Sequence, residues 1–144
     1  MSAHDGASEA FAAALAGNRI AAPGAELVLV EWSDPGGEIG AGPRYIAPLH
    51  VHREDDEAWY VLDGALVVRR GSEDVEVPAG GAVLVPRGTP HSYWNPLAGR
   101  TRYLLVMTPR IAALIDALHT LEARDEATLV ATFAAHASEY LGWP

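Results

Sequence analysis

The feature that most constrains this chain is a pair of histidines, His50 and His52, followed by Glu57 and, much later, by His91. Side chains two residues apart on a β-strand point to the same face, so His50 and His52 are predicted to project together. Glu57 has the opposite parity on a straight strand, so the chain must break before it. The charged run at residues 53–56 suits that break. A second strand is expected to begin at Glu57.

Three imidazoles and one carboxylate form a donor set suited to a divalent first-row transition metal, with iron, manganese, nickel, copper and zinc all left open. We therefore predict one metal ion bound by His50, His52, Glu57 and His91. The alternative is a barrel with polar interior histidines, each needing its own hydrogen-bond partner. Because three histidines and a glutamate are expected to converge, we favour the metal site. The remaining histidines, at positions 4, 119 and 136, are not assigned to it.

Short apolar runs separated by glycine and proline turns predict an all-β sandwich or barrel over residues 24–109. One predicted strand runs from about Arg44 into His52, and an Asp63–Gly64 pair predicts a hairpin. Residues 8–16 are rich in helix formers and predict an N-terminal helix. The sequence thus divides into an N-terminal helical arm (1–23), a barrel (24–109) and C-terminal helices packed on the barrel (110–144).

The segment after Pro109 changes to helical periodicity. Its first helix carries an apolar stripe of Ile111, Leu114, Ile115 and Leu118. A second helix is predicted from about Asp125, with one face formed by Leu129, Phe133, His136 and Tyr140. These helices are expected to lie near the barrel mouth or a subunit contact without plugging the cavity.

Two longer motifs carry a resemblance to a known family. Nine residues match both motifs in order: His50, His52, Glu57, Gly64, Gly80, Pro86, Gly88, His91 and Asn95. In these positions the chain resembles the metal-binding cupins, in particular the quercetin-dioxygenase-like ones. One departure is Arg44, which stands where the family often has a glycine, with Gly42 two residues earlier. The resemblance implies a double-stranded β-helix (jelly-roll) barrel, the four metal ligands named above, and a homodimer.

Strand parity suggests further site residues. Arg44 shares parity with His50 if the strand is unbroken, so it is predicted to reach the cavity and pair with a substrate oxygen, the alternative being a surface arginine. Trp59 follows the parity of Glu57, and Tyr93 and Asn95 follow that of His91. Trp59 and Tyr93 are either pocket aromatics or core residues, and Tyr93 is also a candidate proton donor.

Composition narrows the class of protein. The 144 residues include no cysteine, and all ten basic residues are arginine, which excludes thiolate and Schiff-base chemistry. A formal net charge of −9 disfavours binding to nucleic acid or to an anionic membrane. The first residues lack a basic segment followed by an apolar core, so we expect no signal peptide and a cytoplasmic protein.

The fold alone leaves several functions open. Our first hypothesis is a metal-dependent, dioxygenase-like enzyme acting on a small oxygen-bearing molecule, aromatic or enolisable, with Glu57 serving as base if it leaves the metal. The second is a metal-bound sensing or storage module that binds a small molecule without turnover. The third is a non-redox isomerase or cyclase working by Lewis acidity, and zinc at the site would favour it.

Overall fold

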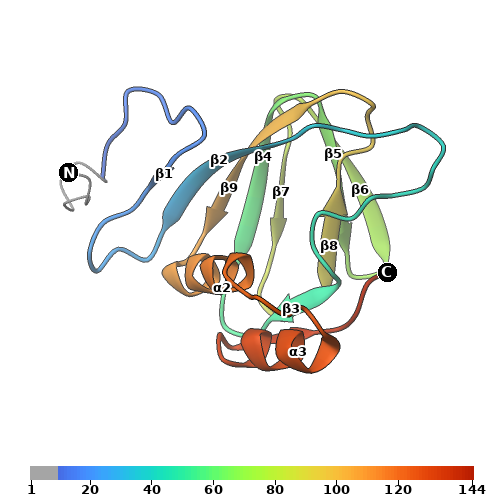
Figure 1. Ribbon diagram of the computed structural model, residues 1–144. Coiled ribbons are helices and arrows are strands. Elements are labelled where there is room, and N and C mark those ends of the chain that lie inside the picture. Colours follow the sequence, from blue (N-terminus) through green and yellow to red (C-terminus); the bar gives the residue numbers. More distant parts are fainter. Residues whose placement is uncertain (1–9) are drawn as a thin grey trace.

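The fold consists of two five-stranded antiparallel sheets that enclose the core, with two helices at one end (Figure 1). The computed structural model describes residues 10–144. The first sheet has the order β1-β2-β9-β4-β7 and the second has the order β10-β3-β8-β5-β6. The elements are β1 Arg19–Ile20, β2 Val28–Asp34, β3 His50–His52, β4 Glu57–Asp63, β5 Ala65–Arg70, β6 Glu73–Pro78, β7 Ala82–Val85, β8 His91–Trp94, β9 Thr101–Met107, α2 Pro109–His119, α3 Glu126–Ala134 and β10 Ser138–Tyr140.

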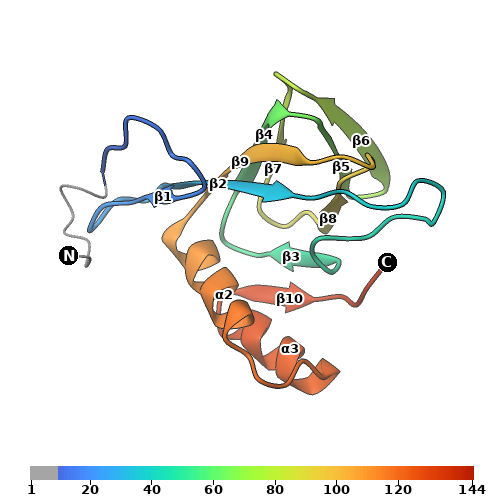
Figure 2. The ribbon, with the colours of Figure 1, turned by 45° about the horizontal axis from the view of Figure 1, so that its top comes forward.

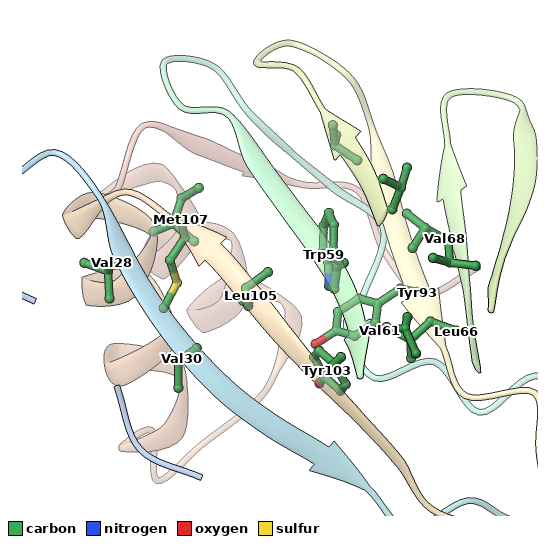
Figure 3. Close-up of a cluster of buried hydrophobic side chains, with 14 of the residues drawn as sticks. Val28, Val30, Trp59, Val61, Leu66, Val68, Tyr93, Tyr103, Leu105 and Met107 are labelled. Carbon is green, nitrogen blue, oxygen red and sulfur yellow. The ribbon is translucent and has the colours of Figure 1, made fainter. Parts of the chain in front are cut away.

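The hydrophobic core lies between the two sheets (Figure 3). Side chains alternate along β9, where Tyr103, Leu105 and Met107 are buried and their neighbours are only partly so. On the adjacent β4, Trp59 and Val61 point inward in the same way. Each such side chain stabilises the fold by roughly 1.5–3 kcal/mol on burial. The architecture confirms the prediction of an all-β, jelly-roll-like barrel.

The turn at Asp63–Gly64 is a corner between the sheets, so the predicted hairpin is wrong. Strand β4 pairs with β7 and β9, whereas β5 pairs with β6 and β8. Gly64 has a φ of +87°, and a Cβ there would lie 2.4 Å from Oγ1 of Thr101. That hydroxyl donates to the Ala65 carbonyl at 2.8 Å, which closes the corner. A glycine is therefore required for both its backbone conformation and its lack of a side chain.

The N-terminal segment differs from its prediction. Residues 10–16 are not helical, and residues 8 and 9 of the predicted helix lie outside the described residues. The Phe11 side chain is 74% exposed, so it buries no helix face, and a short helix without packing is marginal in water. The chain instead turns at Gly17 and adds strand β1 to β2, with Arg19 opposite Val30. The first sheet therefore begins at Arg19, before the predicted boundary at residue 24.

The predicted strand from Arg44 to His52 is also mostly absent. Only His50–His52 forms strand β3, and Tyr45 makes an isolated bridge to Trp94. Pro43 and Pro48 cannot donate to a ladder, which explains the interruption. The parity that placed Arg44 beside His50 therefore does not hold.

The C-terminal segment forms two helices and a strand. Helix α2 begins after Thr108, whose hydroxyl caps the amide of Ile111 at 3.2 Å, as the periodicity predicted. Helix α3 ends at Ala134, earlier than predicted, because Ala137 adopts a φ of +54° and reverses the chain. Strand β10 then pairs with β3, so its edge lies against the histidine strand (Figure 2). Within residues 10–144, no helix combines the length and the apolar character needed to span a bilayer.

Candidate metal centre and its cavity

The four predicted ligands come together from three strands of the two sheets. His50 and His52 lie on β3, His91 begins β8 directly opposite His50, and Glu57 begins β4 in the other sheet. All four side chains are buried, with at most 7% exposed. Their ligand atoms lie within 4.8 Å of one another. The His50 and His91 rings are closest, with centroids 4.3 Å apart.

Each histidine ring is held from its outer side through Nδ1. The partners are the carbonyl of Pro48 for His50 (2.7 Å), the hydroxyl of Ser138 for His52 (2.7 Å) and the carbonyl of Thr89 for His91 (2.9 Å). A carbonyl only accepts, so Nδ1 of His50 and His91 carries the proton. The Ser138 hydroxyl donates to the His136 carbonyl at 3.1 Å and so accepts from His52. In the neutral rings all three Nε2 atoms are therefore free to coordinate.

The Nε2 atoms meet the carboxylate of Glu57. Oε1 of Glu57 lies 3.0 Å from Nε2 of His91 and 3.2 Å from Nε2 of His52. Lone pairs at this distance repel unless a proton or a cation lies between them. Two ligands about 2.1 Å from one ion and at right angles are about 3.0 Å apart. The residues therefore fit a metal ion both in donor chemistry and in spacing.

The site is electrostatically prepared for a cation. Burial, reinforced by the neighbouring His91 and His52, lowers the pKa of His50 from 6.5 to about 3, which keeps this ring neutral. Burial alone would raise the pKa of Glu57, but in the metal-free site hydrogen bonds that His52 and His91 donate when their rings are protonated outweigh it and hold the pKa well below its usual range. Glu57 is thus an ionised carboxylate among imidazoles, which is the form that coordinates metal.

The acidic run before Glu57 is anchored to the rest of the protein. Asp55 is only 5% exposed and pairs with Arg110 of α2 at 2.9 Å. Asp56 accepts the backbone amide of Arg87 at 2.8 Å and pairs with its guanidinium. These contacts fix the loop that carries the chain from β3 to Glu57 in the other sheet.

A cavity of about 320 Å³ opens from the cluster toward the C-terminal helices. This is at the small end of the range for ligand pockets, roughly 300–1,000 Å³. His50, His52 and Glu57 line its inner end. Its walls are mainly aliphatic and aromatic, with Leu105 from β9, Ile111 and Leu114 from α2, and Phe133 from α3.

Three aromatic residues supply polar atoms to this cavity. Trp59, Tyr93 and Tyr103 all line it and lie close together inside the barrel (Figure 3). The two tyrosine hydroxyls are 3.0 Å apart. Burial raises the pKa of Tyr103 to about 12 and that of Tyr93 well above its usual value, so both remain neutral phenols. Nε1 of Trp59 is buried and has no hydrogen-bond partner among the described residues.

Two of the predicted pocket residues do not face this cavity. Arg44 pairs with Asp34 at 3.3 Å and, like Asn95, lines a separate surface cleft. The Asn95 side chain holds the β8–β9 turn, accepting the amide of Leu97 at 2.9 Å and donating to the Gly99 carbonyl at 2.9 Å. Its role here is therefore in folding. Trp59 and Tyr93, the other two predicted pocket residues, line the cavity and are also part of the buried core.

Sequence reasoning missed the contribution of the C-terminal segment. Ser138 orients His52, and the Phe133 ring lies 5.3 Å from that of His50. His119 is not part of the metal cluster, as expected, but it lines the cavity. His136 lies outside both and bonds the Thr132 carbonyl at 2.8 Å. Nothing in the local pattern distinguishes Ser138 from an ordinary polar residue, because its role depends on the pairing of β10 with β3.

Comparison with known proteins identifies the family. Residues 37–107, which include all four clustered residues, match the family model described as "Cupin domain". The chain contains a cupin domain. Strand β2, helices α2 and α3 and strand β10 lie wholly or largely outside the matched residues. The family model therefore covers the metal cluster but not the helical end of its cavity.

Individual relatives support the cupin domain without fixing a reaction. A quercetin 2,3-dioxygenase of Bacillus subtilis is 44% identical over 46 residues, which is 32% of this chain and 14% of that enzyme. A sugar phosphate isomerase of Silicibacter pomeroyi superposes with a TM-score of 0.50 at 22% identity, covering 58% of this chain and 51% of the other. The cupin domain of Schizosaccharomyces pombe Cnp3 gives 0.50 at 17%, covering 62% and 57%. These two structures share the fold, and the chain spans about half of their length.

Proposed function

We propose that this chain is a metal-dependent cupin acting on a small oxygen-bearing molecule, aromatic or enolisable, in a dioxygenase-like reaction. The observation that carries the proposal is the arrangement of the cavity. Three members of the three-histidine, one-glutamate cluster, His50, His52 and Glu57, line its inner end, and the walls are mostly apolar and aromatic. The local similarity to a quercetin 2,3-dioxygenase points in the same direction.

The charge and shape of the site favour an oxygen anion of a compact substrate. A divalent ion and the single charge of Glu57 sum to about +1, and such an ion acts as a Lewis acid and, if redox-active, supports chemistry with oxygen. The enclosing side chains of Leu105, Ile111 and Phe133 exclude water from the bound molecule. A sugar phosphate would require many more polar partners than these walls provide, so an aromatic or enolisable substrate fits better.

Trp59, Tyr93 and Tyr103 are proposed to bind a second substrate oxygen. One tyrosine hydroxyl donates to the other, which leaves one phenolic proton unused. The indole N–H of Trp59 is close enough to the Tyr93 hydroxyl to offset part of the rise that burial causes in the pKa of that phenol, but within the described residues it completes no hydrogen bond. A buried donor without a partner costs about 1–3 kcal/mol, and a ligand acceptor would remove that cost. Tyr93 is the candidate proton donor, because it stays protonated and lines the cavity beside His91.

The test begins with metal analysis of protein purified without a metal-affinity column. Oxygen uptake is then measured after reconstitution with each first-row metal, against catechols, flavonols and 1,3-diketones. Glu57→Gln retains the side-chain size but removes its charge, so we expect bound metal with reduced turnover. His50→Ala is expected to release the metal as well. Glu31→Gln is the matched control, because Glu31 is also a largely buried carboxylate but pairs with Arg102 at 2.9 Å, away from the cluster.

The outcomes separate the three classes of function. Uptake that disappears in Glu57→Gln and persists in Glu31→Gln supports the oxygenase. Native zinc with substrate conversion but no oxygen uptake would replace it with a non-redox isomerase or cyclase. Tight ligand binding without turnover for any metal would identify a binding module.

A further inference from the structure

The cavity is also lined by a set of side chains that the proposed function has not used. We define the mouth cluster as Trp32, His119, Arg124 and Trp143, all of which line the cavity. They come from β2, from the end of α2, from the α2–α3 connection and from the C-terminal tail. None of them lies within the residues matched by the cupin model.

Arg124 is the charged member of this cluster and lacks an acidic partner. Among residues 10–144, eight of the ten arginines pair with a carboxylate: Arg19, Arg44, Arg53, Arg69, Arg70, Arg87, Arg102 and Arg110. Arg124 and Arg100 do not, and only Arg124 lines the cavity. In a chain with a net charge of −9, a cavity-lining arginine without a carboxylate partner in residues 10–144 departs from the pattern of the other arginines.

The guanidinium of Arg124 is partly held in place. One of its nitrogens, Nη1, donates to the carbonyl of Leu118 at 2.7 Å, near the end of α2. This leaves the N–H groups of Nη2 and Nε for a ligand. The adjacent Asp125 makes no ion pair with Arg124, and its carboxylate accepts the Thr128 hydroxyl at the start of α3. The arrangement suits a bidentate bond to an oxyanion.

The other members of the cluster provide aromatic surface. The rings of Trp32 and His119 have centroids 6.3 Å apart at an angle of 54°. Trp143 is 53% exposed, so its indole is accessible to a ligand. Aromatic rings beside a cation are suited to a flat ligand that carries a negative charge.

From these observations we infer that the ligand of this cavity is an aromatic anion whose charged group binds Arg124 at the mouth. Its aromatic body lies against the mouth cluster and the apolar walls, and its metal-binding oxygen points to the inner end. The inference rests on the proposed function, since it assigns other residues of the same cavity. The inference extends the proposed function by assigning a negative charge to the ligand and by naming Arg124 as the residue that selects for that charge.

The test uses two fluorescent probes that share one aromatic skeleton. 1-Anilinonaphthalene-8-sulfonate is an anion, and N-phenyl-1-naphthylamine is its neutral counterpart. Binding of both is titrated with chelator-treated protein, so the result does not depend on metal or turnover. We expect Arg124→Gln to weaken binding of the sulfonate about five- to tenfold and to leave the neutral probe within about twofold, as loss of one charged hydrogen bond predicts. Arg124→Lys should recover part of the loss, because it retains the charge without the planar fork.

Arg100→Gln is the matched control, because it removes the other unpaired arginine, which does not line the cavity, and it should change neither affinity. Added salt should weaken sulfonate binding to the original protein more than to Arg124→Gln. Equal loss of both probes in Arg124→Gln, no loss of either, or no binding of the sulfonate to the original protein would each overturn the inference. Because no metal is present, these outcomes are separate from failure of the proposed reaction.

Discussion

Ser138 provides a sharp test of the predicted metal site. It orients His52, one of the predicted metal ligands, and lies outside residues 37–107, which match the cupin family model. Its hydroxyl is the partner of Nδ1 of His52 at 2.7 Å, and the residue is only 1% exposed. In Ser138→Ala the imidazole loses that acceptor, and Nε2 is no longer fixed toward Glu57. Loss of an outer partner of a metal-binding histidine lowers metal affinity about 10–100-fold, or about 1.4–2.7 kcal/mol. The buried Nδ1 proton left without a partner also costs about 1–3 kcal/mol of folding stability.

The assay is a competition titration of metal between the protein and a chelator, with urea denaturation of the metal-free protein beside it. Ser92→Ala is the matched control. Ser92 is fully buried and follows His91 in the chain. Its hydroxyl donates to the Ala47 carbonyl at 2.6 Å and makes no hydrogen bond to any of the four predicted metal ligands. We expect both variants to lose stability and only Ser138→Ala to lose metal affinity. Ser138→Thr should retain most of the affinity, since it keeps the hydroxyl.

The reasoning would be refuted if Ser138→Ala bound metal as tightly as the original protein, or if Ser92→Ala lost as much affinity. The first result would mean that His52 does not depend on its Nδ1 partner for orientation. The second would mean that affinity simply follows the stability of the second sheet.

Three further predictions follow from the structure. In metal-free folded protein the pKa of His50 is about 3, whereas in the unfolded chain it is about 6.5. The unfolded state therefore binds the extra proton first, and the free energy of unfolding should fall by up to about 1.4 kcal/mol per pH unit as the pH drops between these two values. The lowered pKa of Glu57 acts in the same direction below about pH 4.3. Urea denaturation from pH 7 to pH 4 checks this, and a flat or rising profile would contradict it. Gly64→Ala should lower the free energy of unfolding by more than about 2 kcal/mol, because the added Cβ would clash with Thr101. Gly71→Ala, where nothing lies near the added Cβ, should lower it by about 1 kcal/mol. Similar losses in both variants would be inconsistent with the corner geometry. The homodimer implied by the family resemblance predicts twice the 15.3 kDa chain mass in light scattering, and a monomer at micromolar concentration would disprove it.

The His50, His52 and Glu57 part of the predicted metal site could be predicted from the sequence because its geometry is local. His50 and His52 share a face through the two-residue period of a strand, and the short charged run sets the break before Glu57. His91 required the family motif, since nothing in strand parity alone specifies that β8 pairs with β3. Once the motif is recognised, the alignment of His50 with His91 follows from the fold.

The errors arise where missing packing or interactions with the local backbone override the local sequence pattern. Residues 10–16 have helix-forming composition but bury no face, so propensity alone does not make a helix there. Asn95 shares parity with His91, yet its amide satisfies the backbone of the following turn and is not free for substrate. The periodicity over Phe133 and Tyr140 continues through Ala137, where a positive φ ends the helix geometry. In each case the deciding interaction is with a residue distant in sequence or with the local backbone.

The C-terminal segment contributes both to the predicted metal site and to the part of the cavity where we infer that the small-molecule ligand is selected. Strand β10 reaches the second sheet through backbone pairing, with Ser138 opposite His52, and thereby supports one ring of the predicted metal site. The same segment closes the cavity with Phe133 and carries Arg124 and Trp143 at its mouth. Donor atoms that must converge on one ion tolerate little change, whereas helices covering the open end can change without moving them. The residues outside the cupin match are therefore where the identity of the ligand is expected to be determined.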